Sequence, residues 1–179
     1  MKATVAPEVF QQKKPVALAR WLIGRHLVRR LTDGATEARM ILETEAYVGE
    51  RDLACHARAG RTARTEVMYG AGGVWYVYLC YGIHEMLNLV VGPRDWPAAV
   101  LIRGVEGASG PGRVTKTLAI DRSLNRAAAD EASGLWIEDR GVRVPRGKIL
   151  ATPRIGIDYA GPVWAAKPWR FVLAGSARL

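Results

Sequence analysis

Along this 179-residue chain, hydrophobic positions repeat with the period of a helix in some segments and with the period of a strand in others. Turn residues separate these segments. Residues 15–23 form an amphipathic run that begins with proline and that Gly24 can end, which predicts a helix. Residues 26–31 follow a strand pattern, and the Asp-Gly dipeptide at 33–34 is typical of a tight turn. We therefore expect an antiparallel hairpin between residues 26–31 and the next strand, at 41–50.

Strand patterns dominate the rest of the chain. An aromatic and β-branched block at 74–81 turns at Gly82 into a second apolar run at 86–91, which predicts another hairpin. Residues 98–103 are typical of a buried strand, and residues 109–120 of a capped helix. Shorter strands are expected at 135–138, 149–157 and 169–173.

These elements predict an α+β fold built on a curved, largely antiparallel sheet that resembles an open barrel. Helices should flank the sheet, and the second hairpin should protrude from it. The length and the 49% hydrophobic composition suit a single domain at residues 1–179, which is long enough to bury its own core. Residues 1–14 precede the first helix and are a candidate flexible N-terminal arm.

Charge narrows the choice of partner. Lysine and arginine total 26 against 17 for aspartate and glutamate, a net charge of +9. Such an excess indicates a polyanionic partner, with nucleic acid first and an acidic membrane second. No apolar run approaches the roughly 20 residues that span a bilayer, and no signal-peptide pattern opens the chain, so we expect a cytoplasmic protein without a membrane partner. Cys55 and Cys80 fit neither a disulfide framework nor a metal site.

The strand at 41–50 places two carboxylates and an aromatic ring among apolar residues. Strand alternation puts Glu43, Glu45 and Tyr47 on one face, and Leu42 with the intervening residues on the other. Carboxylates at close range tend to separate their pKa values, which suits general acid or base chemistry. A solvated strand face without a catalytic role accounts for the pattern equally well.

A basic loop and three tyrosines follow that strand. Residues 51–73 are polar and glycine-bearing, which predicts a surface loop. Tyr76, Tyr78 and Tyr81 then lie on the second hairpin, where they either stack on bases or belong to the core. Tyr81, beside the turn at Gly82, either wedges between base steps or caps the core of its own hairpin.

Four segments match a known family in order and separation, a combination that chance seldom produces. They are LETEAY at 42–47, GRTARTEVM at 60–68, YVYLCYG at 76–82 and LIRGVE at 101–106. On these residues the chain resembles the 3-methyladenine (alkyladenine) DNA glycosylases of the non-helix-hairpin-helix type. The resemblance implies a base-excision repair enzyme that needs no cofactor, flips damaged purines out of duplex DNA and hydrolyses the N-glycosidic bond.

The resemblance also implies roles for individual residues. Glu45 would be the general base for the water that attacks C1′, and Arg103 would hold that water and the Glu45 carboxylate. Glu43 would support them. An ion pair of Arg103 with Glu43 or Glu106 is the alternative role for the arginine.

The residues that would handle the substrate follow in the same way. Tyr47 and Tyr78 would stack on the flipped base, and His56 would complete the pocket, although a lone histidine in the core is the alternative. Asn88 would crowd the exocyclic amine of undamaged guanine. Tyr81 would fill the gap left in the duplex.

Phosphate contacts are expected from arginines outside that pocket. Residues 110–116 resemble the glycine hairpin of another class of DNA-binding module, but a strand precedes them, so we expect a helix start whose Arg113 meets a phosphate. Arg58, Arg61 and Arg64, at three-residue intervals in the basic loop, would do the same.

The resemblance implies that the partner is double-stranded DNA with damaged purines, bound by a monomer that associates with the nucleoid in a bacterium. The lesions would be 3-methyladenine and 7-methylguanine, with hypoxanthine and ethenoadenine as further candidates. Nothing around Lys116 suggests a Schiff-base nucleophile, so no lyase activity is expected. Two other classes stay open: a noncatalytic RNA- or tRNA-binding module, and a carbohydrate glycosidase. The second is weaker because Glu43 and Glu45 point the same way, about 7 Å apart, whereas such enzymes flank the bond.

Overall fold

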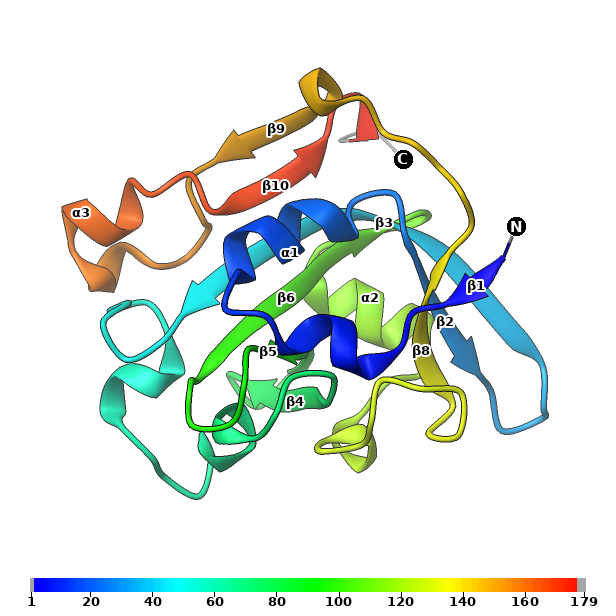
Figure 1. The fold of residues 1–179 in the computed structure, drawn as a ribbon, viewed down its shortest axis with the longest axis horizontal. Helices are drawn as coiled ribbons and strands as arrows, with labels where there is room; N and C mark the ends of the chain where they lie inside the picture. The colour runs from blue at the N-terminus through cyan, green and yellow to red at the C-terminus, as the bar shows by residue number, and fades with distance from the viewer. Residues whose placement is uncertain (1, 177–179) are drawn as a thin grey trace.

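A curved antiparallel sheet organises the computed structural model, which describes residues 2–176 (Figure 1). The strand order is β1-β8-β2-β3-β6-β5-β4, while β10 pairs with β3 and β9, and β7 pairs with β6. Within the described residues no pairing joins β1 to β4, so the sheet is open. The strands are β1 (Ala3–Thr4), β2 (His26–Arg30), β3 (Thr36–Val48), β4 (Trp75–Cys80), β5 (His84–Val91), β6 (Ala98–Val105), β7 (Ala108–Ser109), β8 (Leu135–Asp139), β9 (Ile149–Thr152) and β10 (Arg170–Leu173).

Short helices pack around this sheet, and α1 lies across β3 and β6 in Figure 1. The predicted α+β class, with an open, antiparallel sheet flanked by helices, is confirmed. The helices are α1 (Pro15–Leu22), α2 (Pro111–Thr117) and α3 (Pro162–Ala165), with 3₁₀ turns η1 (Pro7–Gln11), η2 (His56–Ala59), η3 (Glu66–Tyr69), η4 (Arg122–Leu124), η5 (Arg146–Lys148) and η6 (Asp158–Ala160).

Both predicted hairpins are confirmed. Strand β2 pairs with the first half of β3, and β4 pairs with β5. The turn between β4 and β5 has positive φ at two successive residues, 50° at Tyr81 and 70° at Gly82. Ile83 N–H donates to the Cys80 carbonyl at 3.1 Å, which closes the turn beside the pairing of Cys80 with His84. The bulky residue in the left-handed region stands at the tip, where Tyr81 is 91% exposed.

One face of the sheet forms the main core, because alternate residues of its strands turn toward the helices. Trp75 and Val77 of β4 pack there with Leu22 of α1 and Val114 of α2. The hydroxyl of Thr44 donates to the Ala19 carbonyl of α1 at 2.8 Å, which satisfies a fully buried polar group. The opposite face of the same strands is therefore left for other contacts.

A β-bulge interrupts the expected alternation of β3. The register against β6 shifts on both sides of Glu43. Ile41 packs in the main core, whereas Leu42 and Glu43 both line a second cavity. The prediction that Leu42 shares the face of Thr44 and Ala46 is therefore wrong, because the extra residue of a bulge reverses the direction of the side chains that precede it.

Several boundaries also differ from those expected. Residues 51–73 are not simply a surface loop, because they form η2 and η3 and bury Cys55, Val67 and Met68. The expected strand at 149–157 ends at Thr152, and the expected helix at 109–120 is shorter. The single domain and the N-terminal arm stay predictions, although Phe10 is fully buried. Within residues 2–176 no helix combines the length and the apolar surface needed to cross a membrane.

Candidate active site

The sheet face opposite the core lines a cavity of about 570 Å³. In β4, Tyr76 and Tyr78 turn toward this cavity while Trp75 and Val77 turn toward the core. The period of two therefore serves both surfaces of the strand. All the predicted catalytic and substrate-binding residues line the cavity, together with two predicted DNA-binding residues: Glu45, Tyr47, His56, Arg64, Tyr78, Tyr81, Asn88 and Arg103.

Glu45 lies fully buried in the wall of the cavity. One carboxylate oxygen accepts the backbone N–H of Ile155 at 2.9 Å, and the other accepts the hydroxyl of Tyr47 at 2.8 Å. The Nε atom of Arg103 lies 3.7 Å from the first oxygen. Burial raises the pKa of Glu45, while Arg103, the Ile155 amide and the Tyr47 hydroxyl oppose the rise. The group is a fixed carboxylate with an elevated pKa, as a general base requires.

Glu43 occupies the bulge next to this site and is not part of the cavity wall. Its Oε1 atom lies 2.9 Å from Arg103 Nε and 2.6 Å from Arg170 Nη1. Arg103 Nε thus lies near both carboxylates, so the predicted ion pair with Glu43 and the predicted position beside Glu45 occur together. Both acids meet the same arginine from one side, whereas the acids of a carbohydrate glycosidase flank the scissile bond.

An aromatic cluster forms the opposite part of the cavity. The ring centroids of His56 and Tyr78 are 4.7 Å apart, and those of Tyr76 and Tyr78 are 5.2 Å apart. His56 Nδ1 lies 3.0 Å from the Tyr76 hydroxyl. Burial, followed by the charges of Arg64 and Arg58, lowers the pKa of His56 to about 4. The imidazole is therefore neutral near pH 7, and its hydrogen bonds rather than a charge would act on a bound ring.

Asn88 contributes a buried amide to the floor between β4 and β6. Its side-chain nitrogen donates to the carbonyls of Tyr76 and Met86, at 3.2 and 3.3 Å. These bonds satisfy a polar group that is only 4% exposed, and they fix the plane of the amide. The contact with an undamaged base stays a prediction.

The four predicted phosphate-binding arginines are all exposed but differ in their contacts. Arg64 lines the cavity, with its guanidinium 4.9 Å from the centroid of the Tyr78 ring. Arg58 lies over the ring of Tyr159 at 4.7 Å. Arg113 is exposed on α2.

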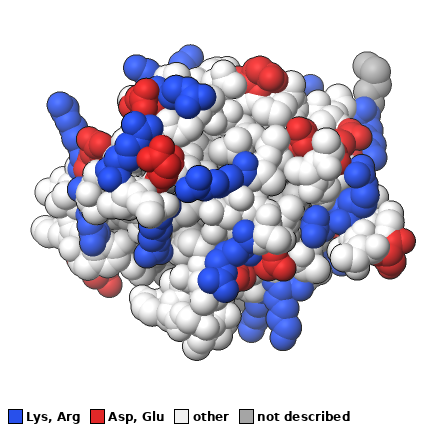
Figure 2. Space-filling view, turned by 90° about the horizontal axis from the view of Figure 1, so that it is seen from below, with Lys and Arg blue, Asp and Glu red and all other residues white. Residues whose placement is uncertain are grey.

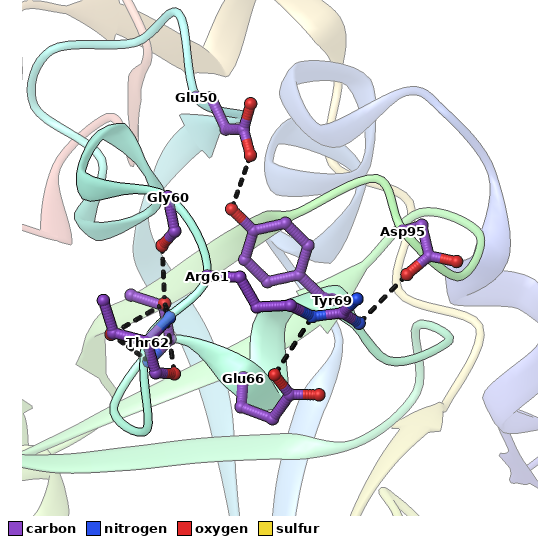
Figure 3. Close-up of polar contacts among 8 residues, drawn as sticks. Glu50, Gly60, Arg61, Thr62, Glu66, Tyr69 and Asp95 are labelled. Carbon is purple, nitrogen blue, oxygen red and sulfur yellow. Dashed lines mark hydrogen bonds and ion pairs between the residues drawn. The ribbon is translucent and has the colours of Figure 1, made fainter.

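Arg61 is held by carboxylates in the contact network that anchors η3 (Figure 3). Its guanidinium lies 3.0 Å from Glu66 and 2.9 Å from Asp95. The Tyr69 hydroxyl in the same network donates to Glu50 at 2.6 Å. Two carboxylates offset the charge of Arg61, so this residue is the weakest of the four candidates for a phosphate contact.

The sequence patterns predicted neither the Ile155 amide nor the buried side chains of Asp52 and Arg154. A backbone donor has no residue-type signal, and residues 154–156 were assigned to a strand. Within the described part of the chain, no three histidine, cysteine or acidic side chains are grouped so as to hold a metal ion.

Comparison with known proteins gives consistent matches. The family model described as methylpurine-DNA glycosylase (MPG) matches residues 9–108 and 106–177. Three similar proteins each carry the name "Putative 3-methyladenine DNA glycosylase". The one from Psychrobacter cryohalolentis is 45% identical over 94% of this chain and 90% of its own length. Those from Methanocella arvoryzae and Anaeromyxobacter dehalogenans are 45% and 43% identical, over 93% and 96% of this chain and 91% and 84% of their own lengths.

Proposed function

Because the chain belongs to the methylpurine-DNA glycosylase family, we propose that it removes alkylated purines from duplex DNA by a water that Glu45 activates. The family membership confirms the resemblance and makes the protein a DNA glycosylase of base-excision repair, a hydrolase of N-glycosyl bonds. The lesions, the residue roles and the absence of lyase activity belong to the proposal. Its substrates are 3-methyladenine and 7-methylguanine, with hypoxanthine and ethenoadenine as further candidates.

The observation that carries the proposal is the buried carboxylate at the wall of a cavity of about 570 Å³. That volume lies within the range of small-molecule pockets and suits a purine with its sugar. Each oxygen of Glu45 accepts one hydrogen bond from the protein, and a carboxylate oxygen has a second lone pair for a water. Glu45 takes a proton from that water as it attacks C1′, while Arg103 at 3.7 Å favours the ionised form.

The aromatic residues of the cavity suit an alkylated base. Tyr47 and Tyr78 supply electron-rich faces, and a cationic purine over such a face gains about 0.5 to 2 kcal/mol. Alkylation also makes the purine a better leaving group, so bond cleavage needs less help. A neutral His56 hydrogen-bonds the base without repelling its positive charge.

The β4–β5 hairpin supplies the residue that would replace the flipped nucleotide. Tyr81 stands at its tip with 91% of its surface exposed, while the hydrogen-bonded strands below hold the tip in place. A ring in this position inserts between base steps and fills the gap. Extrusion costs only a few kcal/mol when pairing is already damaged, so selection begins with the flip.

Surface charge supports attraction to the DNA backbone. Lysine and arginine side chains are spread across the face in Figure 2, with fewer acidic side chains among them. Together with the net charge of +9, this distribution favours a polyanion and predicts strong salt dependence. We further propose that the protein acts as a monomer on cytoplasmic DNA, in the nucleoid if the cell is bacterial.

A base-release assay tests the proposal. Purified protein with EDTA and without nucleotide should release free 3-methyladenine from methylated duplex DNA and leave alkali-sensitive abasic sites without strand breaks. Failure to release 3-methyladenine, 7-methylguanine, hypoxanthine and ethenoadenine would refute it. Strand breaks without alkali would refute the monofunctional mechanism alone.

A further inference from the structure

A fully buried ion pair lies behind the cavity wall. Arg154 Nη1 and Nη2 donate to the two carboxylate oxygens of Asp52 at 2.6 and 2.9 Å, and both side chains are 0% exposed. Neither residue lines the cavity. The two are 102 residues apart in the chain, so the pair joins distant segments. We call this pair the Arg154–Asp52 clamp.

The clamp holds the backbone on both sides of the cavity wall. Asp52 accepts the N–H of Val48 at 3.0 Å and that of Ala54 at 3.1 Å. Arg154 donates to the Ala46 carbonyl at 2.8 Å. The end of β3, the start of the η2 segment and the residues after β9 therefore meet at one bidentate pair.

The guanidinium of Arg154 also contacts two aromatic rings. Its central carbon is 4.8 Å from the centroid of Tyr47 and 5.1 Å from that of Trp169. A planar guanidinium with two donors to one carboxylate and a ring on its face has a defined orientation. The ring of Tyr47 consequently rests on a fixed plane.

Each segment that the clamp joins carries part of the proposed site. Tyr47, whose ring lies on Arg154, donates to one oxygen of Glu45. Ile155, the next residue after Arg154, donates its amide to the other oxygen. His56 is two residues after Ala54, whose N–H donates to Asp52. Both protein donors to the Glu45 carboxylate are thus one step from the clamp.

We propose that Arg154 and Asp52 are positioning residues that hold the Ile155 amide and the Tyr47 hydroxyl on the Glu45 carboxylate. This role rests on the proposed function of Glu45. Stability alone is a weak explanation for the pair, because apolar residues of similar volume often replace a buried ion pair without loss. Arg154 Nε is buried with no hydrogen-bond partner among the described residues, which adds to the unfavourable desolvation.

The proposal has a signature in the pH dependence. Burial raises the pKa of Glu45, and the Ile155 and Tyr47 hydrogen bonds lower it by stabilising the charged form. Loosening the clamp weakens both bonds, so the pKa of Glu45 rises further and excision requires a higher pH. The charged and titratable groups around Glu45 are Arg103 on β6 and Glu43 and Tyr47 on β3. Arg170 on β10 pairs with Glu43 and so acts on Glu45 indirectly.

The test is Arg154→Lys, which keeps the charge but loses the fork and the stacked plane. The single-turnover excision rate at pH 7 should fall about tenfold, with DNA affinity changed less than about twofold. On the acidic side of the profile, the pH at which excision reaches half its maximal rate should rise by about one. This is roughly the effect of losing one hydrogen bond to a charged group.

Arg25→Lys is the matched control. Arg25 pairs with Asp139 at 3.1 Å and lies 4.1 Å from the Trp21 ring, so it has the same two kinds of contact at a place that does not line the cavity. This variant should leave the pH midpoint and the excision rate unchanged. An equal shift in R25K, or an unshifted midpoint in folded R154K, would overturn the proposal.

Two further measurements keep the outcome decisive. If R154K does not fold, Trp169→Leu keeps the bidentate pair and one stacked ring, and should give a smaller shift in the same direction; no shift in this variant counts against the clamp. NMR titration of the ¹³C-labelled Glu45 carboxylate reads the same change without catalysis. Wild-type protein that releases no base therefore refutes the proposed function, whereas an unshifted Glu45 titration in the variant refutes the clamp.

Discussion

Replacing Glu45 with glutamine should abolish excision and make the protein more stable. The amide keeps the size of the side chain, and its oxygen accepts from Ile155 while its nitrogen donates to Tyr47, so both hydrogen bonds survive. The base is lost, and a positioned general base contributes about 100- to 10,000-fold, or about 3 to 5 kcal/mol. Single-turnover release of 3-methyladenine should fall by that factor while lesion-duplex binding remains.

The gain in stability follows from burial of the carboxylate. Burial raises the pKa of Glu45 above its ordinary value of 4.5, so folding favours the protonated form. That favourable contribution is complete below pH 4.5 and is lost as pH rises through the folded-state pKa. A rise of one in this pKa corresponds to about 1.4 kcal/mol, or about 3 to 6 °C in Tm for a chain of this size. Glu45→Gln should therefore melt higher than wild type at pH 7 and equally at pH 4.

Glu43→Gln is the matched control, because Glu43 bridges Arg103 and Arg170 outside the cavity. Removing its charge should lower the free energy of unfolding by about 1 to 2 kcal/mol and slow excision less than tenfold. The reasoning about Glu45 is wrong if E45Q retains a tenth of the wild-type rate. It is also wrong if E45Q melts below wild type at pH 7, since the carboxylate would then be a structural ion-pair partner.

Three other predictions concern the surface, the hairpin and the histidine. Arg113→Ala should reduce the slope of log affinity against log salt by about 0.9, measured by anisotropy, and Arg61→Ala by less because carboxylates already hold Arg61. Tyr81→Gly should leave Tm nearly unchanged, since relief of the left-handed conformation offsets the entropy of glycine, while duplex excision falls about tenfold with the lost stacking. Because burial and then Arg64 lower the pKa of His56 to about 4, wild type should lose free energy of unfolding relative to His56→Gln as pH falls from 6.5 toward that value, as thermal melts can show.

Local patterns predicted the parts of the fold that depend on neighbours in the chain. The period of two in β3 placed Glu45 and Tyr47 on one strand face, which lines the cavity, and turn residues at Asp33 and Gly82 located both hairpins. Successive side chains of a strand point to opposite faces because of the backbone geometry, so the sequence alone predicts which of them share a face.

Features that depend on distant contacts were not predictable. The bulge at Glu43 reflects pairing with β6 and has no local signal. The contact of Asp52 with Arg154 joins residues 102 positions apart, and the Ile155 donor is backbone. The contact of Arg64 with the Tyr78 ring also joins separate segments, while Arg64 itself stays exposed and its phosphate contact stays a prediction.

The most direct test of the central claim is a crystal structure of E45Q bound to duplex DNA that contains one ethenoadenine. The account predicts the modified base outside the helix between Tyr47 and Tyr78, Tyr81 in the vacated position, and a water between residue 45 and C1′. A base that stays stacked in the duplex, or one that enters the cavity with C1′ turned away from residue 45, would contradict it.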